Sequence, residues 1–309
     1  MRKIILGVVA LAVVAAACSS NTDSGASATP TGGATSAAPV DAKACAAGSD
    51  IPYITDGQLT IGTDNPVFQP WFGGTGSYLD WKANPDFGIG NPASGDGYEG
   101  ALAYDLAEQL GFSKSDVTWV AVGFNELFKP GEKTYDFYIN QISYNPDRAT
   151  VLDFSDSYYE VSQALVVKKD GPYANVKTFA DLKEAQLGAQ TASTSYSYIV
   201  DNIQPAKQPQ AFDKSVDLLA AFNNGQIEGY VVDAPTGYVN VLIGEAKDAT
   251  IPGQFPTIGE QEYFGAVFEL ENPLVDCVNQ AIAVLTDDGT LAQLNEDWLK
   301  KTTYPEIQQ

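Results

Sequence analysis

The sequence contains no histidine among its 309 residues. This absence excludes Ser-His-Asp catalysis and every metal site that depends on imidazole. The CxxC, SxxK, GxSxG and P-loop patterns are absent as well, so no redox, acyl-transfer or nucleotide-hydrolysing motif is recognisable. Paired carboxylates can act as acid and base, but acidic residues in such number are typical of a solvated surface. We therefore expect a protein that is not an enzyme and needs no cofactor or metal.

Basic residues are also scarce. The chain has 17 Lys and Arg against 39 Asp and Glu. Arg2 and Lys3 belong to the leader described below, which leaves 15 basic residues and a net charge of −24. Such a charge excludes binding to nucleic-acid phosphates as a main activity. The hydrophobic content of 44% is ample for packed cores, and the length suits two domains.

Long apolar runs are missing except at the start, where Ile4 to Ala17 follows two positive charges. This pattern indicates a signal peptide over residues 1–17, too short to span a membrane stably. The sequence Ala15-Ala16-Ala17-Cys18 resembles a bacterial lipobox, in which Cys18 is lipidated. A plain secretory cleavage site beside an incidental cysteine is the alternative. We expect a protein anchored to the outer face of the cell membrane by its lipid alone.

Cysteine occurs three times. If Cys18 is acylated, Cys45 and Cys277 remain as a pair in an oxidising compartment, and a disulfide between them is plausible. Alternatively Cys277 is a free core residue, because it lies on an apolar helical stripe. Residues 19–44 are dominated by Ser, Thr, Gly, Ala and Pro. This composition predicts a flexible tether.

Apolar periodicity and turn residues predict the main elements. Strands are expected over residues 58–63, 117–122, 135–142, 164–167, 187–191, 227–232 and 263–268. Helices are expected over residues 102–110, 179–184, 216–222, 274–285 and 291–298, and one begins near Tyr196. Arg148 and Asp233 each follow the carboxyl end of a predicted strand, which is the edge where open α/β sheets bind ligands.

Five motifs occur in an order that resembles one family. They are NPDRA followed by DFSDSYY, LTIGTD, GYEGALAYDLAEQLG, GQIEGYVVDAP and DDGTLAQLNEDWL. Together they are similar to the signatures of the family 3 extracellular solute-binding proteins, the amino-acid-binding components of ABC importers. The resemblance implies a two-lobed, periplasmic-binding-protein-like α/β fold, with two Rossmann-like lobes joined by two hinge strands that close on a ligand.

The resemblance also implies a division of the chain. Residues 18–57 are expected to be the lipidated tether and lead-in. Residues 58–165 and 262–309 are expected to form a discontinuous first lobe, and residues 166–261 the second. The strands 164–167 and 263–268 are the candidates for the two hinge strands. Residues 72–97 form a glycine-rich insertion relative to the family pattern, and the sequence leaves its role open.

Three residues would hold the ends of an amino acid in this family. Arg148 matches the arginine that pairs with the ligand's α-carboxylate, Thr194 lies in the loop that also receives it, and Asp233 matches the aspartate that holds the α-ammonium. Local roles are the alternatives: Arg148 bridging to a neighbouring aspartate, a serine beside Thr194 capping a helix, and Asp233 capping the next helix.

The side chain of the ligand would meet aromatic and polar groups. Phe68 and Phe124 match the two rings that flank the ligand in the family, although each could instead pack within its own lobe. Asp64, Gln141 and Ser143 lie at the predicted strand edges, and they favour a ligand with a polar side chain. The sequence does not identify that amino acid.

Two functions remain. The first is a monomeric receptor that delivers a free amino acid to an ABC permease and its ATPase. The second is a secreted cyclohexadienyl dehydratase, which acts on arogenate or prephenate and resembles the same family. No proton donor for that reaction is recognisable, which favours the receptor. The sequence does not indicate which permease would be served.

Overall fold

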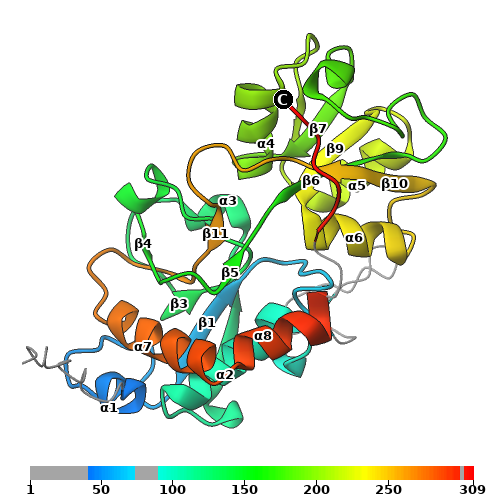
Figure 1. Ribbon diagram of the computed structural model, residues 1–309. Coiled ribbons are helices and arrows are strands. Elements are labelled where there is room, and N and C mark those ends of the chain that lie inside the picture. Colours follow the sequence, from blue (N-terminus) through cyan, green and yellow to red (C-terminus); the bar gives the residue numbers. More distant parts are fainter. Residues whose placement is uncertain (1–40, 74–89, 300–302) are drawn as a thin grey trace, which may run out of the picture. The chain divides into compact units, whose positions relative to one another are not determined.

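The computed structural model describes residues 41–73, 90–299 and 303–309 (Figure 1). The expected signal peptide, Cys18 and nearly all of the expected tether lie outside the described residues. So does the middle of the glycine-rich insertion, residues 74–89. The described part belongs to one compact unit, Pro39–Gln309, which contains two five-stranded sheets.

The first sheet has the strand order β2-β1-β3-β12-β4. Its strands are β1 (Leu59–Thr63), β2 (Val117–Ala121), β3 (Phe137–Tyr138), β4 (Asp153–Phe154) and β12 (Val267–Phe268). Every residue of β1 is buried, as expected for a central strand that is covered on both faces. β1 runs parallel to β2 and β3, whereas β12 is antiparallel to β3 and β4. The parallel strands place their carboxyl ends at one edge.

Helices from both ends of the chain complete this first lobe. They are α1 (Ala42–Ala46), α2 (Tyr98–Gln109), α7 (Leu274–Asp287) and α8 (Thr290–Leu294). The buried face of α7 is the apolar stripe that the sequence predicts, and it joins α2 in one hydrophobic core. Figure 1 shows α7 beside α2. The late helix therefore packs on the early sheet.

The second sheet has the order β10-β6-β9-β7-β8. Its strands are β6 (Gln163–Lys168), β7 (Leu187–Gln190), β8 (Gln210–Phe212), β9 (Gly229–Asp233) and β10 (Ala249–Gln254), and its helices are α4 (Thr194–Tyr198), α5 (Ser215–Asn223) and α6 (Ala234–Leu242). The strand β10 was not predicted, because Pro252 and Gly253 weaken its signal. A register shift between Thr250 and Gly253 accommodates the proline.

Two extended segments connect the sheets. The strands β5 (Tyr159–Glu160) and β11 (Tyr263–Phe264) pair antiparallel to each other in these segments. The expectation that residues 164–167 form a hinge strand is wrong, because they belong to β6, which lies between β10 and β9 inside the second sheet. The hinge pairing lies earlier, at Tyr159–Glu160.

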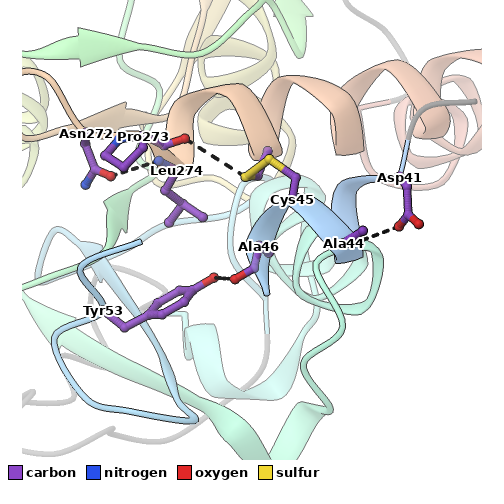
Figure 2. Close-up of a disulfide and its surroundings, with 9 residues drawn as sticks. Asp41, Ala44, Cys45, Ala46, Tyr53, Asn272, Pro273 and Leu274 are labelled. Carbon is purple, nitrogen blue, oxygen red and sulfur yellow. Dashed lines mark hydrogen bonds between the residues drawn. A yellow bond between two sulfur atoms is a disulfide. The ribbon is translucent and has the colours of Figure 1, made fainter. Parts of the chain in front are cut away.

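A disulfide fixes the beginning of the folded region to α7 (Figure 2). Cys45 is bonded to Cys277 with a Cα–Cα distance of 5.4 Å, across 232 positions of sequence. Residues 42–44 are therefore not flexible tether as expected. They belong to α1, which Asp41 caps by accepting a hydrogen bond from the Ala44 N–H at 2.8 Å.

The C-terminal residues make a third connection. The first lobe was expected to extend to residue 309, but Glu306 forms a bridge with Gln254 and Gln308 with Thr178, both in the second lobe. Ile307 is 1% exposed and belongs to the core of that lobe. The first lobe therefore ends before residue 309, because the apolar Ile307 side chain is buried against the second sheet.

The strand predicted over Tyr135–Ile142 is shorter than expected. Only Phe137 and Tyr138 belong to β3, although Asp136 and Ile139 also donate backbone hydrogen bonds to β1. The strand does not continue to Ile142, because Gln141 has a left-handed backbone (φ 50°) and its N–H bonds to the Glu99 carboxylate. The remaining short helical elements are η2 (Pro92–Ser94), η3 (Lys114–Asp116), α3 (Phe124–Leu127), η4 (Arg148–Thr150), η5 (Phe179–Leu182), η6 (Ile199–Ile203) and η7 (Asn295–Leu299).

Candidate ligand-binding site

Strand ends of both sheets surround one cavity. All eight residues predicted to bind ligand line it: Asp64, Phe68, Phe124, Gln141, Ser143, Arg148, Thr194 and Asp233. The cavity encloses about 940 Å³ of space between atoms, part of it open to solvent.

Arg148 lies in the turn η4, just beyond the edge of the first sheet. Its guanidinium donates hydrogen bonds to the Ser143 carbonyl at 2.7 Å and to the Ala192 carbonyl of the second lobe at 2.8 Å. The Phe128 ring lies 4.9 Å from the guanidinium carbon. No ion pair to a neighbouring aspartate is found for Arg148 among the described residues. Its charge is therefore available to an anion that enters the cavity.

Burial shifts the pKa of Arg148 without neutralising it. Desolvation lowers this pKa to about 10, while Glu262 and Asp233 act in the opposite direction. The guanidinium stays positive at neutral pH. A cation that has already lost part of its hydration binds a carboxylate strongly, and a planar guanidinium can do so with two parallel hydrogen bonds.

Asp233 ends β9 on the second sheet and faces the same cavity. It occupies the N-cap position of α6, but its side chain makes no capping hydrogen bond. Instead its carboxylate accepts from the Gln163 Nε2 at 2.9 Å. Burial and the nearby Glu262 raise its pKa to about 8. A cationic group placed against Asp233 would restore its ionised form.

Gln163 joins two acidic residues of the site. Its Nε2 also donates to Glu262 at 3.0 Å, and its carbonyl oxygen accepts from the Ser195 hydroxyl at 2.6 Å. Glu262 lies in the second connecting segment and accepts from the Ser143 hydroxyl at 2.6 Å. One network therefore includes first-lobe, second-lobe and connecting residues.

The loop after β7 caps a helix and also contributes to the wall of the cavity. Ser193 caps α4 by accepting from the Tyr196 N–H at 3.1 Å. Thr194 lines the cavity, and its hydroxyl lies 3.4 Å from that of Ser143. Ala192 has a left-handed backbone (φ 60°), and its carbonyl receives the Arg148 bond.

Aromatic residues form much of the first-lobe wall. Phe68 and Phe124 are half-buried and line the cavity. Trp71, which is 1% exposed, donates its Nε1–H to the Thr236 hydroxyl of α6 at 2.7 Å. The rings provide apolar area for the stem of a ligand, and the Trp71 bond links the lobes directly.

Asp64 follows β1 and is held by backbone donors. It accepts from the Asn65 N–H at 2.7 Å and also from Phe124. Burial raises its pKa to about 6, against these hydrogen bonds and the field of Lys214. At neutral pH it is mainly an anion.

Sequence reasoning missed several members of the site. Ser195 was considered only as a possible helix cap, but it lines the cavity and bonds to Gln163. Thr236 also lines the cavity and was not singled out. The other unpredicted residues bond to lining residues: Glu99, Gln163 and Glu262. The sequence signal that could have indicated some of these residues is a polar residue beside an apolar run that is expected to be buried. Gln163 directly precedes 164–167, and Glu99 lies within a helix whose neighbours are buried.

Two α/β lobes that are joined by two extended segments and line one cavity are the arrangement of the periplasmic-binding-protein fold. The chain belongs to the bacterial extracellular solute-binding proteins, family 3, whose model matches residues 82–301.

Relatives and solved structures agree with this assignment. The ABC transporter arginine-binding protein 1 of Escherichia coli (strain K12) is 27% identical over 208 residues, which cover 65% of this chain and 81% of that protein. The arginine-, lysine-, histidine-binding protein ArtJ from Geobacillus stearothermophilus superposes with a TM-score of 0.64 at 22% identity, covering 79% and 96% of the two chains. The ancestral amino acid-binding protein AncCDT-1, described as a precursor of cyclohexadienyl dehydratase, has a TM-score of 0.62 at 23% identity, covering 79% and 96%.

Within the described residues, no helix combines the length and the apolar character that crossing a membrane requires.

Proposed function

We propose that this chain is an extracytoplasmic receptor that captures a free amino acid between its lobes and delivers it to an ABC permease and its ATPase. The observation that carries the proposal is the placement of opposite charges. Arg148 lies in η4 beyond the first sheet, Asp233 ends β9 of the second sheet, and both line one cavity. Every α-amino acid has the complementary pair of charges.

In this proposal each charge of the ligand has its own partner. Arg148 receives the α-carboxylate, with Thr194 and the start of α4 as further donors. Asp233 accepts the α-ammonium. The ring faces of Phe68 and Phe124 pack on the aliphatic stem. Asp64, Gln141 and Ser143 are left for the ligand's side chain, which favours a polar amino acid.

A thermal-shift screen against the twenty amino acids tests this function. A ligand present at 100 times its dissociation constant stabilises the folded state by about 2.7 kcal/mol. We expect at least one amino acid to raise the melting temperature by several degrees, and Arg148→Ala to abolish the shift. If all twenty leave the wild-type protein unchanged, the amino-acid receptor function is wrong.

The anchor and the oligomeric state form the remaining part of the proposal. We expect a monomer held on the outer face of the membrane by lipidated Cys18. Cys18→Ala should move the protein from the membrane fraction into the medium without changing its ligand affinity. Retention of this variant in the membrane fraction would exclude lipidation as the anchor.

No observation at the site favours the dehydratase. The resemblance to AncCDT-1, at 23% identity, concerns the fold alone. We expect incubation with prephenate or arogenate to yield no product. Turnover that Arg148→Ala abolishes would instead make the protein an enzyme.

A further inference from the structure

Glu99 is a buried carboxylate directly behind the cavity. It lies in the first turn of α2 and is 0% exposed. Its oxygens accept from the Gln141 backbone N–H at 2.6 Å, from the Gln141 Nε2 and from the Tyr158 hydroxyl at 2.5 Å. Three donors converge on this one acid. Glu99 does not line the cavity itself, but Gln141 does.

These hydrogen bonds fix which way the Gln141 amide points. Its Nε2 donates to Glu99 and approaches Asn140 Oδ1 at 3.5 Å. Burial raises the pKa of Glu99 to about 7, so at pH 8 and above its carboxylate is mainly ionised and only accepts. Under these conditions, turning the amide over would set two acceptors against each other. The left-handed backbone of Gln141 is held by the same acid. The amide carbonyl oxygen, at the other end of the planar group, is therefore what Gln141 offers to a ligand.

We infer that Glu99 is a positioning residue that holds Gln141 as a hydrogen-bond acceptor, and that the receptor thereby selects amino acids whose side chains donate hydrogen bonds. This inference rests on the proposed function, in which Arg148 and Asp233 hold the α-groups. The side chain then meets the Gln141 carbonyl and the Asp64 carboxylate, which line the same cavity. Guanidinium, ammonium and carboxamide groups satisfy such acceptors, whereas a side-chain carboxylate adds repulsion.

Glu99→Gln tests the inference. An amide at position 99 places its own N–H₂ among the donors, so Gln141 gains by turning over and presenting its Nε2 to the cavity. We expect the affinity for arginine, lysine or glutamine, whichever the wild type binds most tightly, to fall tenfold or more. The ratio of its affinity to that for glutamate should fall by the same factor or more. The melting temperature of the free protein should not fall, because a buried charge is removed.

Asp136→Asn is the matched control. Asp136 is 3% exposed and accepts two backbone N–H groups, from Ile54 at 2.8 Å and Thr60 at 2.6 Å. Like Glu99 it is a buried acid of the first lobe, but it does not line the cavity. We expect this variant to lose stability while keeping the wild-type ranking of ligands. A purely structural role for Glu99 predicts that Glu99→Gln behaves in the same way.

Calorimetry on the wild type, both acid variants and Gln141→Leu separates the outcomes. Gln141→Leu removes the acceptor without altering position 99, and it should weaken the preference for donor side chains even if Glu99→Gln fails to fold. An unchanged ranking in Glu99→Gln or in Gln141→Leu would overturn the inference. A wild-type preference for glutamate would overturn it too, while leaving the receptor function intact. Failure of every amino acid to bind would refute the receptor function itself.

Discussion

Arg148 and Asp233 are the residues on which the proposed binding depends most. Arg148 donates to two carbonyls and Asp233 accepts from Gln163, so both side chains are already held in place when a ligand arrives. Removing one partner of a buried charge pair costs about 3 to 5 kcal/mol. This corresponds to roughly two to three orders of magnitude in affinity or more.

We therefore predict that Arg148→Ala and Asp233→Asn each abolish calorimetric binding at micromolar protein. The melting temperature of free Asp233→Asn should be unchanged or higher, because burial and Glu262 already disfavour its charge. Lys129→Ala is the control. Lys129 forms an exposed ion pair with Glu126, and such pairs contribute about 0 to 1 kcal/mol. If Arg148→Ala or Asp233→Asn still bound the ligand within tenfold of the parent, that residue would not hold one of the ligand's α-groups.

The sequence predicts some residues of the candidate site better than others. Strand-end positions and motif matches indicated eight side chains, and all line the cavity. Glu99 and Glu262 were out of reach, because their contacts join positions 42 and 119 residues apart. Such partners are set by how the lobes pack, not by local periodicity.

At the scale of elements, the C-terminal segment is the least expected feature. Residues 303–309 leave the first lobe and add Ile307 to the core of the second, where it packs over Gly253 of β10. A side chain at position 253 would meet the Pro305 carbonyl at 2.5 Å. The close approach of the segment therefore depends on glycine.

We predict that Ile307→Ala destabilises the protein by about 2 to 5 kcal/mol, the usual range for such a truncation in a core. Urea unfolding monitored by circular dichroism measures the change. Val200→Ala, at a 40% exposed position of the same lobe, is the control and should change stability by less than about 1 kcal/mol. If Ile307→Ala also lowered the free energy of unfolding by less than about 1 kcal/mol, residues 303–309 would be only loosely attached to the second lobe.

Elements with strong periodicity were predicted closely, whereas short ones were not. The predicted stripe on α7 and the predicted strand at β1 match the structure because burial of one continuous face defines them. β3 keeps two of its eight expected residues, and β10 was missed. After β3, the hydrogen bond from Gln141 to the distant Glu99 replaces strand pairing. In β10, Pro252 and Gly253 weaken the sequence signal, and a register shift accommodates them.

For the whole molecule, burial of acids gives stability a predictable pH dependence. Burial raises the pKa of Asp64 to about 6, of Glu99 and Glu245 to about 7, and of Asp233 to about 8. An acid with a folded-state pKa above its unfolded value stabilises the fold at low pH, and this contribution is lost as pH rises through the folded pKa. The net charge of −22 at pH 7 acts in the same direction.

We predict that the free protein melts at a higher temperature at pH 5 than at pH 8.5, with most of the fall between pH 6 and 8. Scanning calorimetry at constant ionic strength measures it. Asp233→Asn should flatten the upper part of this curve. A melting temperature that rises steadily across the same interval would show that the buried acids do not control stability.

Ligand binding should also change how far the lobes open. Hydrogen bonds join the lobes directly at the cavity, among them Arg148 to Ala192, Trp71 to Thr236 and Ser143 to Thr194. We predict that small-angle scattering gives a smaller radius of gyration for the saturated protein than for the free one. Trp71→Phe removes the hydrogen bond to Thr236, so this variant should need a higher ligand concentration for the same decrease in the radius of gyration. Identical curves for free and saturated protein would indicate a rigid molecule.

The two ends of the folded region belong to different lobes. Asp41 caps α1, which the disulfide holds on α7 of the first lobe, whereas Gln309 follows the residues that pair with the second sheet. Fluorescent dyes attached at these two positions would each move with one lobe and would leave the cavity untouched. Energy transfer between the two dyes would then report opening and closing of the lobes in single molecules, with no label in the interior of either lobe.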